Sequence, residues 1–495
     1  MNLPDLKKTS GVVIAGLLAV GACSPRARPP LGPGPARGCL VTGSGEWPRR
    51  EIAVGVTHPV VPQRAPVASN PGESLVLPFL YETLVDIDCG GQALPALAEA
   101  WRSEADGRVW TFRLDPRARF WDGAPVTAAD VARGLLAAGG PPAGVTHVGV
   151  RDEHTVSLHF ERAHREVPLL VGDRDLSVTA PRRYGDWPVG TGAYRPAPSE
   201  DTLGTDGERD EIVALPREGS SRPPLRFIVR PGVDGRDLLD EGADLLVTRD
   251  AAVIDYAGLR PELEISPLEW DRTYVLLSPT RARAVTRGED VAEGLPVALL
   301  GRLARNAVKG GARPYGSASW WEAREACPAS RARLAELPLR PAPAAYGTGT
   351  RRLAYLEGDA VAGQLAGRLV ALVAGSEREA VTDLAAAIPG LPEAAGALHA
   401  IALPDSAFAT ALHDGSAFLY VVGMSMKVFD ECRAVEMLAR RAPWLPLGSL
   451  ESHRLLVPLI DTRPYLVTRG PMPPIYIGWD GALRVSAPAA GVEER

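Results

Sequence analysis

The chain has 495 residues, of which 45% are hydrophobic, so it is long enough for about three domains of ordinary size. Charged residues make up 23% of it and the mean hydropathy is −0.03, which excludes a disordered chain and a protein with many membrane spans. A net charge of −6 gives no general reason to bind nucleic acid or an anionic membrane. Five cysteines are too few for a small disulfide scaffold.

The first residues have the pattern of an export signal. Lys7 and Lys8 precede the apolar run Gly11–Val20, which is too short to span a membrane as a mature helix. The following residues, up to Cys23, resemble the lipobox of bacterial lipoproteins. We expect a signal peptide over residues 1–22 and acyl chains such as palmitate on Cys23, which would anchor the chain to a membrane of the cell envelope. An ordinary signal peptide followed by a chance cysteine is the alternative.

A proline-rich tether is predicted over residues 23–38, because proline at this density favours extended chain over helix or sheet. After it, no run of about 18 uncharged apolar residues occurs, so no transmembrane helix is predicted. The rest of the chain is expected to face the periplasm or the cell exterior.

Strand and helix patterns alternate beyond the tether. Residues 51–56 alternate as a strand does, residues 74–85 are apolar and helix-like, and residues 94–101 have apolar side chains at helical spacing. A turn signal at residues 106–107 precedes residues 108–114, whose polar and apolar side chains alternate as in a half-buried strand.

Thr127 and Asp130 form a pattern typical of a helix start. A threonine at the N-cap accepts a backbone N–H, and an acid three residues later reaches back to the cap, so a helix is predicted through Leu135. Later strands are predicted at 154–160, 226–230, 244–247, 274–277, 352–356, 418–422 and 475–479, and later helices at 361–373 and 432–441. Alternating strands and helices indicate the α/β class.

An ordered series of motifs then carries a resemblance to a known family. The motifs are Tyr81–Val85, Leu94–Trp101, Trp110–Leu114, Phe120–Val131 and Val189–Tyr194. In this order they resemble the signature region of the extracellular solute-binding protein family 5, the oligopeptide-, dipeptide- and nickel-binding proteins of ABC importers. With a weaker match that extends to residue 280, the resemblance covers about two-fifths of the chain.

The resemblance implies an α/β fold of two lobes around a cleft, as in periplasmic binding proteins, with an extra side domain. Bending at two strands that cross between the lobes would close the cleft on a ligand. In this scheme Glu82, Asp122 and Asp130 are structural residues. Three domains are expected: domain I in the first lobe at 39–75, 185–285 and 452–495, domain II as its side domain at 76–184, and domain III as the second lobe at 286–451.

Export to an oxidising compartment allows disulfides. With Cys23 carrying lipid, the remaining cysteines are Cys39, Cys89, Cys327 and Cys432. Three pairings are possible. We favour Cys39–Cys89 and Cys327–Cys432, because each pair would then lie within one lobe, and free buried thiols remain the alternative.

A candidate ligand-binding stretch follows a late predicted strand. In peptide binders of this family an acid at this place commonly receives the ligand's α-ammonium group. The corresponding stretch here runs from Val421 through Met424 to Asp430 and carries Lys427 where the acid is expected. A positive charge there repels an ammonium group and favours an anionic or neutral ligand, and Asp430 is the nearest carboxylate.

Aromatic side chains are further candidates for the cleft, since ligand sites use rigid apolar walls with a few polar groups. Trp270 and Tyr274 flank the chain as it leads to the second lobe, and Trp320 with Trp321 forms a tandem pair. Adjacent rings point in different directions, so at most one of the pair is expected to face a ligand. Core packing is the alternative for all four.

Signals for catalysis and cofactors are missing from the sequence. There is no phosphate-binding loop, no dinucleotide fingerprint and no nucleophile elbow. His154, His159 and His164 are spaced by five, which alternates faces along a strand and argues against a shared metal ion. No catalytic residue, cofactor or metal site is therefore predicted.

The resemblance implies a lipid-anchored solute-binding protein of an ABC importer. It would capture a peptide-like or other small ligand between its lobes and deliver it to permease subunits, as a monomer held to the membrane by its anchor. The alternative is a diverged member that acts as an envelope-anchored ligand sensor or structural binding module without transport, which the altered second lobe favours. An envelope hydrolase is least favoured, because no nucleophile constellation is present.

Overall fold

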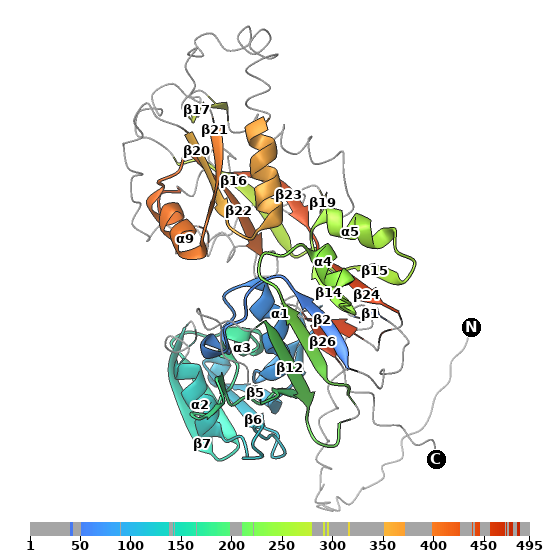
Figure 1. Ribbon diagram of the computed structural model, residues 1–495. Helices are drawn as coiled ribbons and strands as arrows, with labels where there is room; N and C mark the ends of the chain where they lie inside the picture. The colour runs from blue at the N-terminus through green and yellow to red at the C-terminus, as the bar shows by residue number, and fades with distance from the viewer. Residues whose placement is uncertain are drawn as a thin grey trace, which may run out of the picture. The chain divides into compact units, whose positions relative to one another are not determined.

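The structure is a computed structural model, and every residue that it describes belongs to the unit Gly34–Arg495 (Figure 1). Residues 40–42, 51–89, 91–137, 142, 144–164, 166–198, 210–220, 222–279, 291–292, 295–296, 315–316, 351–371, 398–425, 438, 441–445, 456–470, 472, 475–478 and 483–485 are described. Within these ranges, no helix is both long enough and apolar enough to cross a membrane.

The first large sheet has seven strands, in the order β11-β12-β13-β2-β14-β24-β15. Their bounds are Tyr194–Pro196, Glu211–Pro216, Leu225–Val229, Ile52–Val56, Leu245–Thr248, Tyr465–Arg469 and Leu263–Pro267, in the same order. The central strands β13, β2 and β14 are parallel, and the outer pairs are antiparallel. All five residues of β2 are buried, as expected for a parallel strand covered on both faces.

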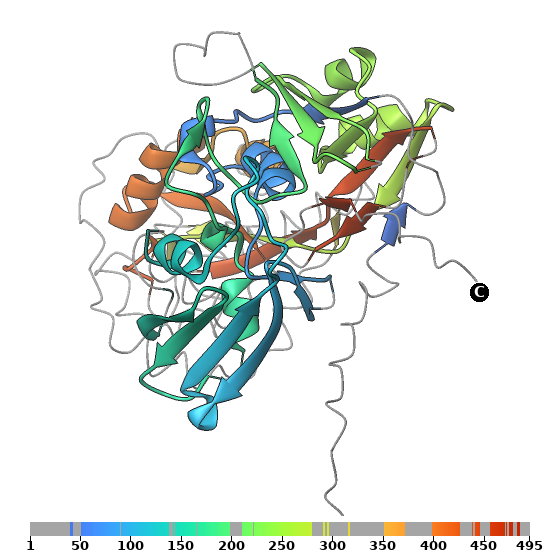
Figure 2. The same ribbon diagram turned by 90° about the horizontal axis from the view of Figure 1, so that it is seen from below.

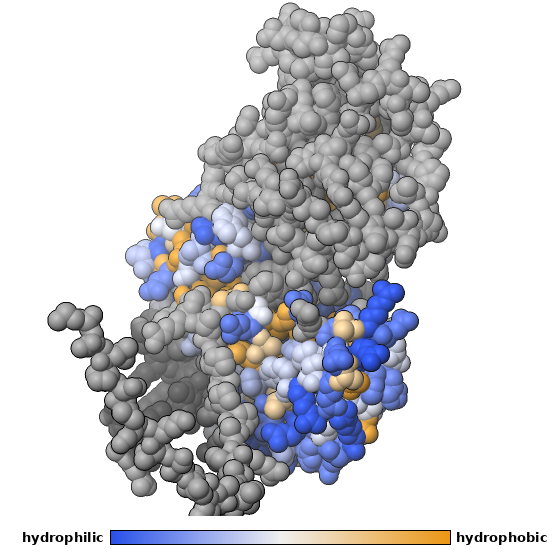
Figure 3. Space-filling view, turned by 180° about the vertical axis from the view of Figure 1, so that it is seen from behind, coloured by the Kyte–Doolittle hydropathy of each residue, from blue (hydrophilic) through white to orange (hydrophobic). Residues whose placement is uncertain are grey.

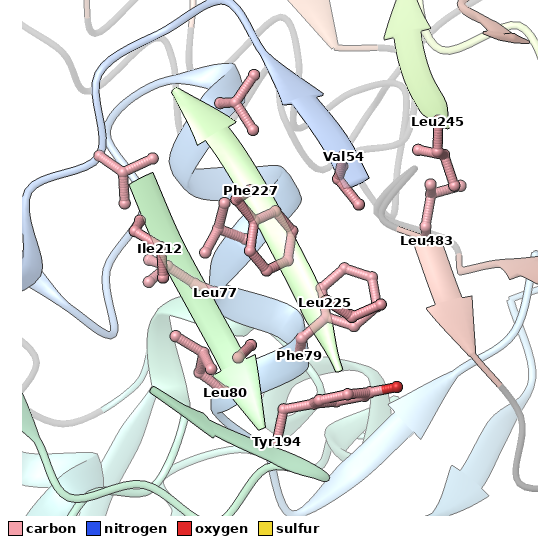
Figure 4. Packing of buried hydrophobic residues seen from close by; sticks show 14 of the residues in the cluster. Val54, Leu77, Phe79, Leu80, Tyr194, Ile212, Leu225, Phe227, Leu245 and Leu483 are labelled. Carbon is pink, nitrogen blue, oxygen red and sulfur yellow. The ribbon is translucent and has the colours of Figure 1, made fainter. Parts of the chain in front are cut away.

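Helices cover both faces of this sheet. On one face, Leu77, Phe79 and Leu80 of α1 (Pro71–Leu80) belong to the same buried cluster as Phe227, and Figure 4 shows these side chains around β12 and β13. On the other face, the helices α4 (Gly235–Asp240) and α5 (Ala251–Gly258) contribute to a second cluster that includes Ala53 of β2. Alternate residues of β2 therefore serve two different cores.

A smaller antiparallel sheet forms a side domain, with strand order β5-β6-β8-β7. Its strands are β5 (Ala98–Glu104), β6 (Val109–Leu114), β8 (Thr155–Phe160) and β7 (Val145–Asp152). One face packs against α2 (Ala128–Ala137), as seen in Figure 2. The strands predicted at 108–114 and 154–160 are confirmed.

The predicted capping box is also confirmed. Asp130 Oδ2 accepts hydrogen bonds from the N–H and the hydroxyl of Thr127, at 3.0 and 2.7 Å, and the Asp130 N–H donates to Thr127 Oγ1 at 3.3 Å. Asp122 pairs with Arg182, whose Nη2 lies 2.8 Å from Oδ1. Both acids hold the side domain together, which agrees with their structural interpretation.

The helix predicted at residues 94–101 is wrong. The chain there forms β4 (Ala93–Pro95), paired with β3 (Val85–Ile87), and then enters β5. The N–H groups of Leu97 and Ala98 donate to the carbonyls of Thr83 and Leu84, so partners distant in sequence replace the helical ones. The helix predicted at 74–85 ends at Leu80, and the last predicted residue, Val85, begins β3 instead.

The second large sheet has six strands, in the order β19-β23-β16-β22-β20-β21. Their bounds are Tyr315–Gly316, Leu456–Thr462, Arg272–Leu277, Leu419–Ser425, Arg351–Leu356 and Leu398–Leu403, in the same order. Strands β21, β20 and β22 are parallel. A helix over 360–371 packs on one face and α9 (Asp405–Asp414) on the other.

Shorter elements complete the described part of the chain. They are β9 (Arg183–Tyr184) with β10 (Trp187–Pro188), β17 (Val291–Ala292) with β18 (Leu295–Pro296), the sheet of β1 (Leu40–Thr42), β25 (Ile475–Ile477) and β26 (Leu483–Val485), α3 (Val167–Val171), and the 3-10 turns η2 (Pro62–Arg64), η3 (Ala105–Gly107) and η4 (Arg174–Leu176). The helix predicted at 432–441 lies almost entirely outside the described residues.

One antiparallel ribbon joins the two large sheets. Strand β15 continues into β16 through Leu268–Asp271, and β23 continues into β24 through Arg463–Pro464. Leu268 N donates to Pro464 O at 2.9 Å between the two connections, and Asp271 N donates to Thr462 O, at the end of β23, at 3.3 Å. We call these two connections the crossover ribbon.

Gly192, in the Val189–Tyr194 motif, packs closely against the end of α1. A Cβ atom at this position would lie 2.5 Å from the carbonyl oxygens of Phe79 and Leu80, at the end of α1. Backbone cannot move aside as a flexible side chain can, so Gly192→Ala is expected to lower the free energy of unfolding by about 1–3 kcal/mol.

Gly367→Ala is the matched control, since nothing lies within 4 Å of its added Cβ. In the helix over 360–371 this change should raise stability by about 0.5–1 kcal/mol. Urea unfolding measures both values. A Gly192→Ala protein as stable as the unsubstituted chain would contradict the close packing.

Candidate functional site

A cluster of ionisable side chains lies where the first and second sheets meet the crossover ribbon. We call it the polar cluster, and its members are His58, Arg249, Asp271, Arg272, Tyr274 and Asp359. These residues come from four separate stretches of chain, at positions 58, 249, 271–274 and 359. No single sequence motif therefore contains them.

Three members follow the carboxyl ends of parallel strands. His58 comes just after β2, Arg249 directly after β14, and Asp359 shortly after β20. In open α/β sheets, the carboxyl ends of parallel strands are where ligands bind. A Cβ placed on Gly358 would lie 3.9 Å from His58 Nε2, so the strand ends of the two sheets are close together here.

Tyr274 and Asp359 form the buried side of the cluster. The Tyr274 hydroxyl lies 2.8 and 3.0 Å from the two carboxylate oxygens of Asp359, and its side chain is fully buried. Asp359 also accepts the Ala362 N–H at 3.0 Å, as an N-cap does. Burial, followed by the charge of Asp359, raises the pKa of Tyr274 well above its ordinary value, so the phenol keeps its proton.

Two arginines bring positive charge to the cluster. Arg272 Nη1 lies 3.5 Å from Asp359 Oδ2, and Arg249 Nη2 pairs with Asp271 Oδ2. Each guanidinium has five N–H donors, but its hydrogen bonds with described residues use only one nitrogen. Arg249 Nε and Asp271 Oδ1 are buried without any partner among the described residues. The cluster therefore keeps unused hydrogen-bonding capacity, mostly as cationic donors.

His58 is a half-buried, uncharged member. Its Nδ1 lies 3.1 Å from the Thr57 hydroxyl. Burial lowers its pKa below 6.5, Arg272 and Arg249 lower it further, and Asp359 acts in the opposite direction. The imidazole therefore adds hydrogen-bonding capacity without adding charge at neutral pH.

Gly423 of β22 forms the floor of the cluster. A Cβ there would lie 3.1 Å from both Arg272 Cδ and Tyr274 Cε1, and 3.4 Å from Asp359 Oδ2. A side chain would push on all three residues, so the glycine leaves the space that the network needs.

An aromatic and arginine stack lies on the crossover ribbon itself. The Arg463 guanidinium lies over the rings of Trp270 and Tyr465, with 4.9 and 5.3 Å to the ring centroids. Trp270 is 36% exposed, which is high for a tryptophan. The stack joins the two connections of the ribbon through side chains as well as backbone.

The structure places three of the predicted ligand-contacting residues. Tyr274 lies inside the polar cluster and Trp270 lies beside it on the ribbon. Met424 is 7% exposed and packs in the hydrophobic core of the second sheet. Trp320, Trp321, Lys427 and Asp430 lie outside the described residues, as do Cys23, Cys39, Cys327 and Cys432. Cys89 forms a disulfide, and its partner is not among the described residues.

The sequence interpretation missed His58, Arg249 and Asp359. Each follows a recognisable strand, which is the one local signal that could have pointed to them. Which strands are parallel, and which of their ends meet, depends on the tertiary structure. In the described part of the chain, no group of three or more potential ligands could hold a metal ion.

Comparison with known proteins agrees with the family resemblance seen in the sequence. Residues 92–200 match the profile of the bacterial extracellular solute-binding proteins, family 5, middle region. A curated relative, the periplasmic murein peptide-binding protein MppA of Escherichia coli, is 38% identical over 71 residues. That alignment covers 13% of this chain and 13% of MppA, so sequence similarity to this relative is confined to about an eighth of its length.

Solved structures are similar over most of the chain. NikA from Brucella suis in complex with Fe(III)-EDTA has a TM-score of 0.63 at 16% identity, covering 88% of this chain and 100% of that one. A dipeptide-binding protein from Pseudoalteromonas sp. SM9913 in complex with Met-Leu has a TM-score of 0.63 at 12% identity, covering 88% and 98%. Both of these structures contain a bound ligand. The likeness confirms the expected α/β, two-lobed fold.

His58 predicts a specific pH dependence of stability. Because its pKa is lower in the folded chain than the ordinary 6.5, the unfolded chain takes up the proton first as the pH falls. The contribution of neutral His58 to the free energy of unfolding is fully present above pH 6.5. It declines as the pH falls towards the folded pKa, by at most about 1.4 kcal/mol per pH unit. Between pH 7.5 and 5.5, His58→Gln should lose less stability than the unsubstituted chain.

The exposed His399 of β21 supplies the control. His399→Gln should keep the pH dependence of the unsubstituted protein in thermal unfolding. Identical pH profiles for all three proteins would show that His58 is not held neutral by burial.

Proposed function

Because the chain belongs to family 5 of the bacterial extracellular solute-binding proteins, we propose that it captures a small ligand at the polar cluster for an ABC importer. Delivery to permease subunits is part of this proposal, and the chain would act as a monomer. The observation that carries it is the unused hydrogen-bonding capacity of Arg249 and Arg272 at the ends of parallel strands from two sheets.

The charges of the cluster favour a ligand with a carboxylate. Asp359 is already engaged by a phenol, a backbone N–H and a guanidinium, and Asp271 has one oxygen paired with Arg249. Among the described residues, the two guanidinium groups have more hydrogen-bond donors without a partner than the two acids have acceptors without one. Arginine binds carboxylates through paired N–H donors, which makes it the natural partner of such a ligand.

Two further observations support an anionic group. Lys427 follows Ser425 by two residues, and Ser425 pairs with Arg272 in the sheet register, so another cation lies close in sequence to the cluster. The Fe(III)-EDTA bound by NikA and the Met-Leu bound by the dipeptide-binding protein both carry carboxylates. We propose that Lys427, Asp430 and one of Trp320 and Trp321 complete the site beside Trp270.

Ligand capture would use the crossover ribbon as a hinge. The segments Leu268–Asp271 and Arg463–Pro464 are short, and Arg249 reaches Asp271 on one of them. A ligand that draws Arg249 or Arg272 towards its carboxylate would act directly on the ribbon. Binding and bending of the hinge would therefore be coupled through a single ion pair.

The test compares free acids with their amides. Met-Leu and Met-Leu amide, together with other dipeptides, amino acids and their amides, are titrated into the protein and followed by thermal shift and calorimetry. We expect acids to bind at least tenfold more tightly than the matched amides. Arg272→Gln should weaken the binding of an acid by about 10–100-fold, the value of a lost hydrogen bond to a charged group.

Arg236→Gln is the matched control, because the exposed Arg236 pairs with Asp234, the N-cap of α4, and forms no ion pair with a member of the polar cluster among the described residues. It should bind acids as the unsubstituted protein does. Equal binding of acids and amides, or an Arg272→Gln protein that retains the preference for acids, would contradict the proposed site.

We also propose that the chain is anchored by lipid on Cys23 and that Cys89 pairs with Cys39. Leu40 pairs with Tyr476, and Asp88 forms a β-bridge with Gly478, so the residues next to both cysteines bond to the same short segment. This neighbourhood supports the pairing, and Cys327 would then be left to pair with Cys432. The family profile describes extracellular proteins, which suits both an anchor and disulfides.

A peptide map of protein extracted from membranes tests both attachments. We expect an N-terminal peptide that begins with an acylated Cys23, and a cross-linked peptide joining Cys39 to Cys89 that separates on reduction. Cys23→Ser should release the protein from the membrane fraction without changing the cross-link. Cross-linking of Cys89 to Cys327 or Cys432 would contradict the pairing.

A further inference from the structure

We propose that the side domain carries a two-histidine site for a divalent transition metal ion, formed by His147 and His159 on the face of the sheet opposite α2. It lies outside the polar cluster and does not depend on the proposed function. The spacing of His154, His159 and His164 in the sequence gave no hint of it, because His147 comes from the neighbouring strand.

The sheet register places the two histidines side by side. His147 of β7 pairs directly with His159 of β8. On β8, the neighbours Leu158 and Phe160 point into the hydrophobic core, so His159 points to the opposite face. His147 is exposed and His159 is partly exposed, so an ion can reach both rings from solvent.

The ring separation is close to that required by one bound ion. Bonds of about 2.0–2.1 Å from imidazole nitrogen to metal put each ring centroid roughly 3.2 Å from the ion. Two such rings at about 90–109° around the ion have centroids about 4.5–5.2 Å apart. The observed separation of the His147 and His159 centroids is 5.3 Å, with an angle of 56° between the rings.

The ε nitrogens of both rings face the same neighbouring pair of residues. His159 Nε2 lies 3.2 Å from the Ser157 hydroxyl. A Cβ at Gly149, which pairs with Ser157, would lie 3.5 Å from His147 Nε2 and 2.8 Å from Ser157 Oγ. The missing side chain at Gly149 leaves room for an ion between the nitrogens and the hydroxyl.

A nearby positive charge on the same hairpin is paired. The Arg151 guanidinium is bound by Glu104 through two contacts of 2.7 and 3.1 Å, and Glu104 also accepts from Arg102 at 2.9 Å, so this carboxylate offsets the charge of Arg151 in part. The described surface of the side domain is mainly hydrophilic in Figure 3, at the lower right. Imidazole nitrogen suits Zn²⁺, Ni²⁺ and Cu²⁺, with Cu²⁺ bound most tightly, and water would complete the coordination.

The experiment uses untagged full-length protein with Cu²⁺, Ni²⁺ and Zn²⁺ as separate probes. Calorimetry should show one ion bound per chain, and electron paramagnetic resonance of the Cu²⁺ form should show coupling to two nitrogens. An ion that binds only the folded chain also raises its melting temperature. His147→Ala and His159→Ala should each weaken binding at least tenfold and remove this rise.

His154→Ala is the matched control, since His154 lies in the turn of the same hairpin and its N–H bonds to Asp152. It should bind each ion as the unsubstituted protein does. Melting curves without metal separate loss of the site from loss of the fold. Unchanged affinity in both His147→Ala and His159→Ala, or Cu²⁺ coupled to a single nitrogen, would overturn the proposal.

Discussion

The crossover ribbon is the constraint on which the rest of the structure depends. It carries the chain from the first sheet to the second and back, with a backbone hydrogen bond at each end of the longer connection, Leu268–Asp271. One connection has four residues and the other has two, so regular pairing is interrupted there. An interrupted ribbon bends at lower cost than a continuous ladder, because fewer hydrogen bonds must change. The same few residues therefore connect the two large sheets and allow bending between them.

The polar cluster is built against this ribbon at a real energetic cost. Burying guanidinium and carboxylate groups is unfavourable unless each is paired, and the pairs here only offset that loss. Tyr274 illustrates the arrangement: it is fully buried, yet its hydroxyl is satisfied by Asp359, which also caps a helix. Arg249 Nε and Asp271 Oδ1 are left buried and unpaired among the described residues. Buried polar atoms without a hydrogen-bond partner lower the stability of the fold, and a ligand that supplied the partner would recover that loss.

The region that matches the family profile does not include the polar cluster. The family profile matches residues 92–200, whereas the cluster draws on His58 and on residues from Arg249 onwards. The matched motifs have scaffold roles that sequence alone made visible. Gly192 allows the chain to pass the end of α1, and Thr127 with Asp130 starts α2. The matched region therefore accounts for parts of the scaffold, and the polar cluster lies outside it.

The sequence alone determined the α/β class, most strands and the helix start at Thr127, because alternation and capping are local properties of the chain. It misassigned residues 94–101, where Pro95 and apolar residues at helical spacing belong instead to strands whose partners are distant. Only the tertiary structure decided which strand ends meet. It brought His58, Arg249 and Asp359 together, paired His147 with His159, and placed Met424 in the core. These outcomes depend on parallel pairing and register between segments far apart in the chain, which no local pattern of side chains encodes.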